Sequence, residues 1–264
     1  MRRCAGIAFG LGTHGLFAVT VWYLFWFLKG TAAAAPAGGS LWVDALLALQ
    51  FAVPHSVLLL PSVRSRLTRV IPAAFYGCVY CVITCVSLLF MFANWRASPI
   101  VIWRATGYGA TVVTLSFFCS WAALFYSLHL TGLGYQTGWT PWWHWLRGRP
   151  QPRRGFEPRG AYLWLRHPVY LSFLGLIWFT PVMTADRAVL TGIWSAYIFL
   201  GSWLKDERLH FYLGGSYRLY QAAVPGYPGM PLGPLARRPL AEPQLLVNRP
   251  GPEREKDVPS RLAA

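Results

Sequence analysis

The sequence predicts an all-α, polytopic membrane protein. Hydrophobic residues make up 55% of the 264-residue chain, and charged residues only 12%. Each of four apolar stretches reaches the roughly 20 residues that a helix needs to cross a bilayer core of about 30 Å, and they lie at about 6–28, 41–60, 74–93 and 107–130. Two shorter stretches follow, at about 168–183 and 189–204, separated by a turn at 184–188. We therefore expect four transmembrane helices plus a C-terminal helical hairpin, which gives five to six membrane segments.

The first apolar stretch has an alternative interpretation as a cleaved signal peptide. It follows Arg2 and Arg3, and small residues at 31–35 offer a cleavage site. The apolar region of a signal peptide has about 7–15 residues, and this stretch is much longer. We expect it to remain as a transmembrane helix.

The net charge of +15 suggests either binding of nucleic acid or orientation in a membrane. If the N-terminus lies inside, alternating helices place nearly all of the 24 Lys and Arg residues in inside segments; the exceptions are Lys29, Arg96, Arg104 and Arg187. The positive-inside rule accounts for this distribution without a polyanion. We expect both termini to be cytoplasmic, the lipid bilayer to be a partner, and no nucleic acid to bind.

The chain divides into three regions. Residues 1–130 hold the first four helices, 131–230 hold an inside loop, the hairpin and an amphipathic C-terminal segment, and 231–264 form a predicted disordered tail that is poor in aromatic residues. The loop is rich in Gly, Pro, Arg and Trp, a composition typical of a headgroup interface. The amphipathic segment is expected to break at Gly214-Gly215 and to end at Pro225.

Cysteines and histidines raise the question of a metal or haem. Three cysteines share one helix face by their spacing and are expected to pack there, with no metal site predicted: Cys78, Cys81 and Cys85. Three histidines lie on or beside helices, where ionisable residues are often functional: His14, His55 and His129. A haem held by two histidines is the competing interpretation, although no pair has a defined spacing.

The inside ends of the two hairpin helices carry a group of ionisable residues. Arg166 and His167 precede Pro168, which suits the first turn of a helix, and Asp206-Glu207 ends the second helix. A tight hairpin brings both pairs to the same membrane face. Free N–H groups at a helix start attract anions, and arginine adds a forked donor. This pattern predicts a binding site for a ligand with an anionic and a cationic part; the alternative is ordinary snorkelling of charges to the interface.

This region resembles the signature of the isoprenylcysteine carboxyl methyltransferase superfamily, integral membrane enzymes that use S-adenosylmethionine. The motif Arg166-His167-Pro168-Val169-Tyr170 is followed by a second, Gly214-x-x-Tyr217-x-x-Tyr220-x-x-x-Val224-Pro225. The similarity to the bacterial methanethiol S-methyltransferase branch extends over roughly 1–230 and includes His55-Ser56, Pro61, Arg69, 146–150, 180–185 and Tyr197. It implies a bacterial inner-membrane location.

The resemblance also implies roles for individual residues. Contacts with S-adenosylmethionine are implied for Phe156, Glu157, Tyr162, Arg166, His167, Pro168, Val169, Tyr170 and Tyr217, with 154–157 closing over the cofactor. A substrate contact is implied for His55. Two positions depart from the pattern: Ser172 replaces a smaller residue, and Lys205 replaces the first of two acidic residues. Asp206 or Glu207 must then supply the catalytic carboxylate, and we expect Lys205 to stabilise an incoming thiolate.

The expected function is methyl transfer from S-adenosylmethionine to a small thiol such as methanethiol, giving dimethyl sulfide. The reaction needs a thiolate placed in line with the methyl group. Nearby cations increase the thiolate population, and a dry membrane-level site favours a reaction in which opposite charges cancel. Two alternatives remain: a methyltransferase acting on a prenylcysteine carboxylate or lipid acceptor, and a non-catalytic membrane protein supporting nitric-oxide metabolism.

Overall fold

The computed structural model of the chain describes residues 2–30, 40–151 and 155–239. Its helices in the first half are α1 (Arg2–Lys29), α2 (Leu41–Val57), α3 (Pro61–Leu67), α4 (Ala73–Asn94) and α5 (Gly107–Thr131). The second half contributes α6 (Leu133–Gln136), α7 (Trp139–Leu146), the 3-10 helix η1 (Gly160–Leu163), α8 (Pro168–Trp178), α9 (Ala185–Leu213) and α10 (Gly215–Ala223). Two short strands complete the fold, β1 (Val101–Arg104) and β2 (Val182–Thr184).

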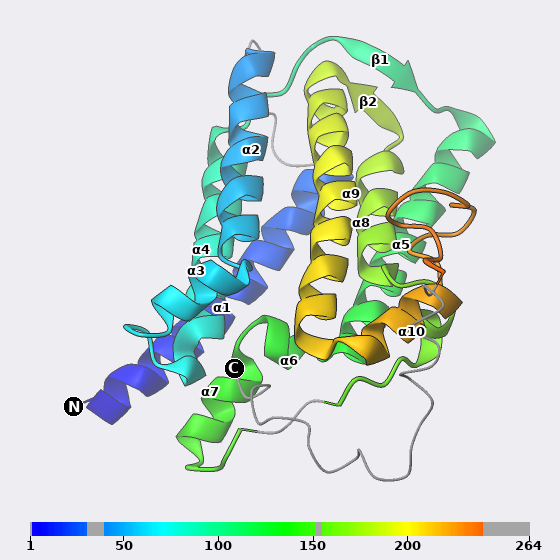
Figure 1. Cartoon of the computed structure of the whole chain (residues 1–264). Helices are drawn as coiled ribbons and strands as arrows, with labels where there is room; N and C mark the ends of the chain where they lie inside the picture. The colour runs from blue at the N-terminus through cyan, green and yellow to red at the C-terminus, as the bar shows by residue number, and fades with distance from the viewer. Residues whose placement is uncertain (1, 31–39, 152–154, 240–264) are drawn as a thin grey trace.

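The long helices form one bundle in which neighbours in space are not always neighbours in sequence. Helix α4 packs against α1 and α2, α9 packs against α2 and α8, and α8 packs against α5. Figure 1 shows α3, α7 and α10 at the end of the bundle where the N-terminus lies, and the two strands at the opposite end. The start of α8 and the end of α9 therefore meet at the same end of the bundle, as the hairpin prediction requires.

Within the described residues, three helices are long and apolar enough to cross a membrane, namely α1, α4 and α5. A fourth candidate is the pair α2 and α3, which is bent by 74° at its break. The fold is thus a helical membrane protein with three to four candidate spans. The predicted count of five to six is not confirmed by these criteria, because α8 has only 11 residues, about 16 Å of helix, and α9 carries charged residues near both ends.

The hairpin differs from the prediction at its turn. Helix α8 ends at Trp178, before Pro181, because the residue preceding a proline is disfavoured in helical conformation. The predicted turn is instead occupied by β2 and the first residues of α9. Strand β2 pairs with β1 in an antiparallel sheet, with Val101 opposite Thr184. The all-α prediction therefore holds for the bundle, with this small two-stranded sheet as an addition.

Helix α9 is longer than the apolar stretch that predicted it. It continues through the charged residues 205–208 and ends at Leu213. The chain breaks at Gly214, whose φ of +56° favours glycine, and α10 ends before Pro225. The predicted break and end of the amphipathic segment are confirmed. Its first half belongs to α9, so that α10 turns back beneath the end of α9.

The core lies where six helices meet, and its largest buried side chains include Leu24, Phe27, Met91, Trp121, Leu176 and Trp194. The three cysteines of α4 are buried, as their shared face predicted. Residues 231–239, assigned to the disordered tail from the sequence, pack on the site end of the bundle, with Leu235 and Ala236 buried. The rest of the predicted tail lies outside the described residues.

Candidate functional site

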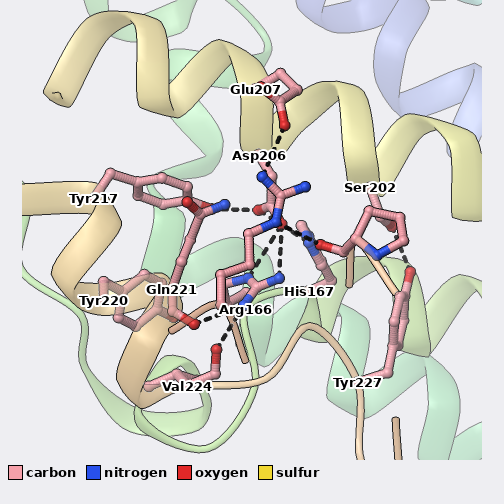
Figure 2. A network of polar contacts seen from close by, with 12 residues as sticks. Arg166, His167, Ser202, Asp206, Glu207, Tyr217, Tyr220, Gln221, Val224 and Tyr227 are labelled. Carbon is pink, nitrogen blue, oxygen red and sulfur yellow. Dashed lines mark hydrogen bonds and ion pairs between the residues drawn. The ribbon is translucent and has the colours of Figure 1, made fainter. Parts of the chain in front are cut away.

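Asp206 is the centre of a buried polar network that joins the ends of α8, α9 and α10 (Figure 2). Its Oδ2 lies 3.1 Å from Nε and 2.9 Å from Nη2 of Arg166. Its Oδ1 lies 3.1 Å from Nε2 of His167 and accepts a hydrogen bond from the hydroxyl of Tyr217. Burial opposes ionisation, but the hydrogen bond from His167 and the nearby Arg166 charge hold the pKa of Asp206 below its usual value. The interior therefore holds a charged carboxylate.

Arg166 connects this carboxylate to the C-terminal part of the chain. Its Nη1 donates to three backbone carbonyls, at 2.7 Å from Val224, 3.2 Å from Ala236 and 3.3 Å from Gln221. Its backbone N–H donates to the carbonyl of Pro225 at 2.9 Å. The side chain is fully buried. The sequence predicted that this guanidinium binds a ligand. In the structure, its hydrogen-bond partners are instead Asp206 and backbone carbonyls of the protein.

His167 immediately precedes the first residue of α8 and has no exposed surface. Burial lowers the pKa of His167 by more than the neighbouring Asp206 raises it. The imidazole is therefore neutral at pH 7, and its Nε2 carries the proton donated to Asp206. Its Nδ1 has no hydrogen-bond partner among the described residues. The ring centroids of Tyr170 and Tyr227 each lie 5.6 Å from that of the imidazole, so His167 packs between network and aromatic side chains.

Residues 224–238, which we call the C-terminal clasp, cover the network from the side of α10. The hydroxyls of Tyr227 and Ser202 lie 2.5 Å apart and are buried (Figure 2). At the edge of the clasp, Arg238 lies 3.1 Å from a carboxylate oxygen of Glu207, and both side chains are more than one third exposed. Of the two acidic residues predicted to be catalytic, Asp206 is thus internal to the network and Glu207 lies at its rim.

Lys205 precedes Asp206 on α9, yet its ammonium group lies among a different set of neighbours. Its Nζ is 5.3 Å from the ring centroid of Tyr170 and 5.9 Å from that of Tyr162, within the range of cation–π contacts. Burial, reinforced by the charge of Arg208, lowers the pKa of Lys205 to about 8. The neutral amine of Lys205 is therefore easier to form than that of an ordinary lysine.

A cavity of about 250 Å³ lies between the α2–α3 break and the facing ends of α8 and α9. Its apolar walls are formed by Leu59, Leu60, Pro61, Leu204 and Phe211. Its polar groups are supplied by Ser56, Tyr170, Tyr197, Lys205, Glu207 and Arg208. Nη1 of Arg208 lies 3.4 Å from the carbonyl of Leu59, so this arginine joins α9 to the break. The arrangement offers an apolar chamber with charged groups on one side.

The other residues implied for the cofactor at the start of α8 lie next to the network. Pro168 is buried at the first position of α8, where its missing N–H is tolerated. Val169 is half-buried and packs against the core. The carbonyl of Tyr162 accepts a hydrogen bond from the hydroxyl of Tyr220 at 2.6 Å. The hydrogen bond between Tyr220 and Tyr162 holds the 3-10 helix η1 against α10.

The loop before η1 contacts α10 through Phe156. The ring of Phe156 is 5.5 Å from that of Tyr217 and 5.3 Å from that of Tyr220. Glu157 is exposed, and Arg154 lies outside the described residues. Phe156 therefore contacts the network through Tyr217, whereas the side chain of Glu157 lies at the surface of the protein.

His55, the predicted substrate residue, lies at the end of α2 rather than in the network. Its Nε2 is 2.8 Å from the hydroxyl of Tyr80, and its Nδ1 is 3.3 Å from that of Thr84. Its ring lies 6.3 Å from that of Tyr197, which lines the cavity. Two hydroxyls of α4 thus hold this histidine one residue layer behind the cavity wall.

Several residues of the site were not singled out from the sequence. Arg208 was only counted among the inside charges, although its place one turn after Leu204 puts it on the cavity side of α9. Tyr227 follows Pro225 by two residues, and its position in a Gly- and Pro-rich run gave no sign of burial. Gln221 lies in α10 between the motif residues Tyr220 and Val224.

Comparison with known proteins assigns a family. A methanethiol S-methyltransferase of Mycobacterium tuberculosis is 29% identical over 237 residues, which cover 85% of this chain and 96% of that protein. A methanethiol S-methyltransferase of Pseudomonas deceptionensis is 31% identical over 205 residues, covering 76% and 75%. Rat Nurim is 27% identical over 177 residues, covering 64% and 67%. No protein-family model and no solved structure matches the chain.

Two of these relatives are methanethiol S-methyltransferases that cover more than three quarters of this chain. The resemblance stated from the motifs is thereby confirmed. The chain belongs to the methanethiol S-methyltransferase family, a branch of the isoprenylcysteine carboxyl methyltransferase superfamily.

Proposed function

We propose that this protein transfers a methyl group from S-adenosylmethionine to methanethiol and so forms dimethyl sulfide. The observation that carries the proposal is that two successive residues of α9 face different surroundings. Asp206 holds Arg166 and His167 in the interior, while the preceding residue, Lys205, lies at a cavity of about 250 Å³. The names of the bacterial relatives support the same reaction.

The residues at this end of the bundle fit the chemistry of S-adenosylmethionine. Among the described residues, Nδ1 of His167 and Nε2 of Gln221 are buried network atoms with neither a hydrogen bond nor an ion-pair contact. The rings of Tyr162 and Tyr170 already face a cation, the ammonium of Lys205, and a sulfonium is recognised by the same aromatic surfaces. A ligand with hydrogen-bonding groups and a positive sulfur satisfies both features.

We assign the predicted cofactor residues to two roles. His167, Tyr162 and Tyr170 would contact the cofactor directly. Phe156, Glu157 and Val169 would form the edges of its binding site. Arg166, Pro168 and Tyr217 act as positioning residues, because their polar groups or backbone are engaged with the protein itself. Asp206 is the residue on which they converge, and Glu207 at the rim faces the cavity together with Lys205.

Lys205 is the residue that we assign to the proton. In its neutral form, Nζ accepts the proton of the thiol, and the resulting ammonium then lies beside the thiolate, which it stabilises. When bound, S-adenosylmethionine supplies an electrophilic methyl group that the thiolate sulfur accepts. The proton leaves Nζ to solvent after the reaction. A pKa of about 8 suits this cycle, because both protonation states of Lys205 are populated near neutral pH.

The apolar walls of the cavity serve the reaction by limiting the contact of a bound thiol with water. Leu59, Leu60 and Leu204 present apolar surface to a small thiol, which partitions readily into an apolar environment. His55 supports the wall through Tyr80 and Tyr197, which is how we interpret its predicted substrate role. Reduced contact with water favours a reaction between a thiolate and a sulfonium, because the charges cancel.

We further propose that the site lies at the cytoplasmic face of a bacterial inner membrane. The site end of the bundle carries the basic residues of α3, the loop after α7 and α10, as the positive-inside rule requires. On this placement α9 crosses the membrane, and α8 enters it only in part, so the spans number five with α8 as a partial sixth. The N-terminus and the C-terminal clasp then face the cytoplasm.

Headspace detection of dimethyl sulfide from cells fed methanethiol tests the function. Cells that express the wild type should release dimethyl sulfide, and cells that express Lys205→Ala or His167→Ala should not exceed the empty-vector level. Lys29→Ala, at the opposite end of the bundle, removes an exposed lysine and should retain full activity. Absence of dimethyl sulfide from cells that contain folded wild-type protein would refute the proposal.

A further inference from the structure

The cavity beside Lys205 is much larger than methanethiol requires. Methanethiol has two heavy atoms and occupies roughly 60 Å³, twice the ~30 Å³ share of one water molecule. The cavity measures about 250 Å³. For comparison, an apolar protein cavity of about 150 Å³ binds benzene. A bound methanethiol would leave most of the apolar wall without contacts, and each missing contact forfeits dispersion energy.

The cavity has an apolar side and a cationic side, which match the hydrocarbon part and the thiolate sulfur of a hydrocarbon thiol. Leu59, Leu60 and Phe211 supply an apolar side, and Lys205 supplies a cation on the other. The remaining charged groups of the cavity are engaged elsewhere: Arg208 with the carbonyl of Leu59, and Glu207 with Arg238. The ammonium of Lys205 rests instead on aromatic rings, so a thiolate is well placed to take it as a partner.

We propose that this cavity is the methyl-acceptor site and that it takes apolar thiols up to the size of benzenethiol. This inference rests on the proposed function and names its substrate class. The sulfur lies toward Lys205 and the hydrocarbon part against Leu59, Leu60 and Phe211. The thiol proton passes to Nζ of Lys205. A sulfur–carbon bond then forms as the carbon–sulfonium bond of the methyl donor breaks, which leaves two neutral thioethers.

Gly201 provides a way to change the size of this cavity alone. It lies in α9 on the cavity wall, and a Cβ atom built there has Tyr170 Oη as its nearest contact, at 4.0 Å. A valine side chain therefore enters the cavity without a backbone clash. Gly192 lies on the same helix, is exposed, and a Cβ atom there meets nothing within 4 Å. Gly192→Val is the matched control for the loss of a helical glycine.

The first measurement compares two acceptors with purified full-length protein in micelles. The wild type and Gly192→Val should methylate both methanethiol and benzenethiol. In Gly201→Val, the ratio of kcat/KM for benzenethiol to that for methanethiol should fall at least tenfold, because a single methylene already discriminates by about 10- to 200-fold in an apolar pocket. A wild type that methylates methanethiol but not benzenethiol overturns this inference and leaves the proposed function standing.

The second measurement is independent of catalysis. Thioanisole, the product expected from benzenethiol, carries no thiol proton and is titrated calorimetrically into the same proteins. The wild type and Gly192→Val should bind it with equal affinity, and Gly201→Val should bind it at least tenfold more weakly. Equal binding by all three proteins overturns the assignment of the cavity. Binding that depends on Gly201, in a protein that methylates neither thiol, supports the cavity as a site and overturns the proposed reaction.

Discussion

Replacement of Asp206 by asparagine tests whether this carboxylate organises the site. Asparagine keeps the shape of the side chain but removes the charge that faces Arg166, and both side chains have no exposed surface. Loss of one partner of a buried ion pair leaves the other charge uncompensated and typically costs about 3–5 kcal/mol. The Asn amide nitrogen also replaces one of the two carboxylate oxygens, so it faces donors either from Arg166 or from His167 and Tyr217, and those hydrogen bonds are lost in addition. We expect Asp206→Asn to lower the free energy of unfolding by about 3–5 kcal/mol.

The neighbouring residue supplies the control. Glu207→Gln removes an ion pair with Arg238 whose side chains are 44% and 37% exposed. Such pairs contribute about 0–1 kcal/mol. Equilibrium unfolding of the purified full-length variants in micelles, followed by Trp fluorescence, compares the two changes. If Asp206→Asn proved no more destabilising than Glu207→Gln, the buried network would not be what holds the ends of α8, α9 and α10 together.

Three further predictions follow from the same contacts. The kcat/KM of the wild type for methanethiol should rise with pH through about 8, the pKa of Lys205, whereas Lys205→Ala should lose that inflection and at least ~100-fold in rate; an unchanged pH–rate profile would contradict the assignment. Because the folded-state pKa of Asp206 lies below its usual 3.8, its stabilisation is complete above about pH 4 and lost at lower pH; acid unfolding of Asp206→Asn should lack this component, and a slope equal to that of the wild type would count against it. A Cβ at Gly10 would lie 2.1 Å from the Trp142 ring, so Gly10→Ala should separate α7 from α1 and lower the melting temperature, whereas Gly12→Ala, with nothing within 4 Å, should not.

The helical bundle and the meeting of its two motif-bearing ends were predictable from the sequence. Apolar length identified the long helices, and the antiparallel hairpin placed Arg166 and Asp206 at the same end, where they form an ion pair. The predicted turn of the hairpin was wrong, because the structure there depends on the pairing of β2 with β1, whose residues lie some 80 positions apart. No local pattern signals such a contact.

The partners of Arg166 show the same limit. Its three carbonyl acceptors belong to residues 55 to 70 positions further along the chain, and backbone carbonyls leave no trace in a sequence. The different surroundings of Lys205 and Asp206 follow from helix geometry, because successive residues point about 100° apart. That conclusion required α9 to continue through both residues, whereas the sequence placed the end of the apolar helix at Leu204.

Transfer of a labelled methyl group tests the central claim most directly. Purified full-length protein in lipid nanodiscs is supplied with methyl-deuterated S-adenosylmethionine and methanethiol, and the dimethyl sulfide formed is analysed by mass spectrometry. The wild type should produce dimethyl sulfide that carries one labelled methyl group, and Lys205→Ala should produce less than about one hundredth as much. Unlabelled or absent product from the wild type, or equal production by Lys205→Ala, would contradict methyl transfer at the cavity beside Lys205.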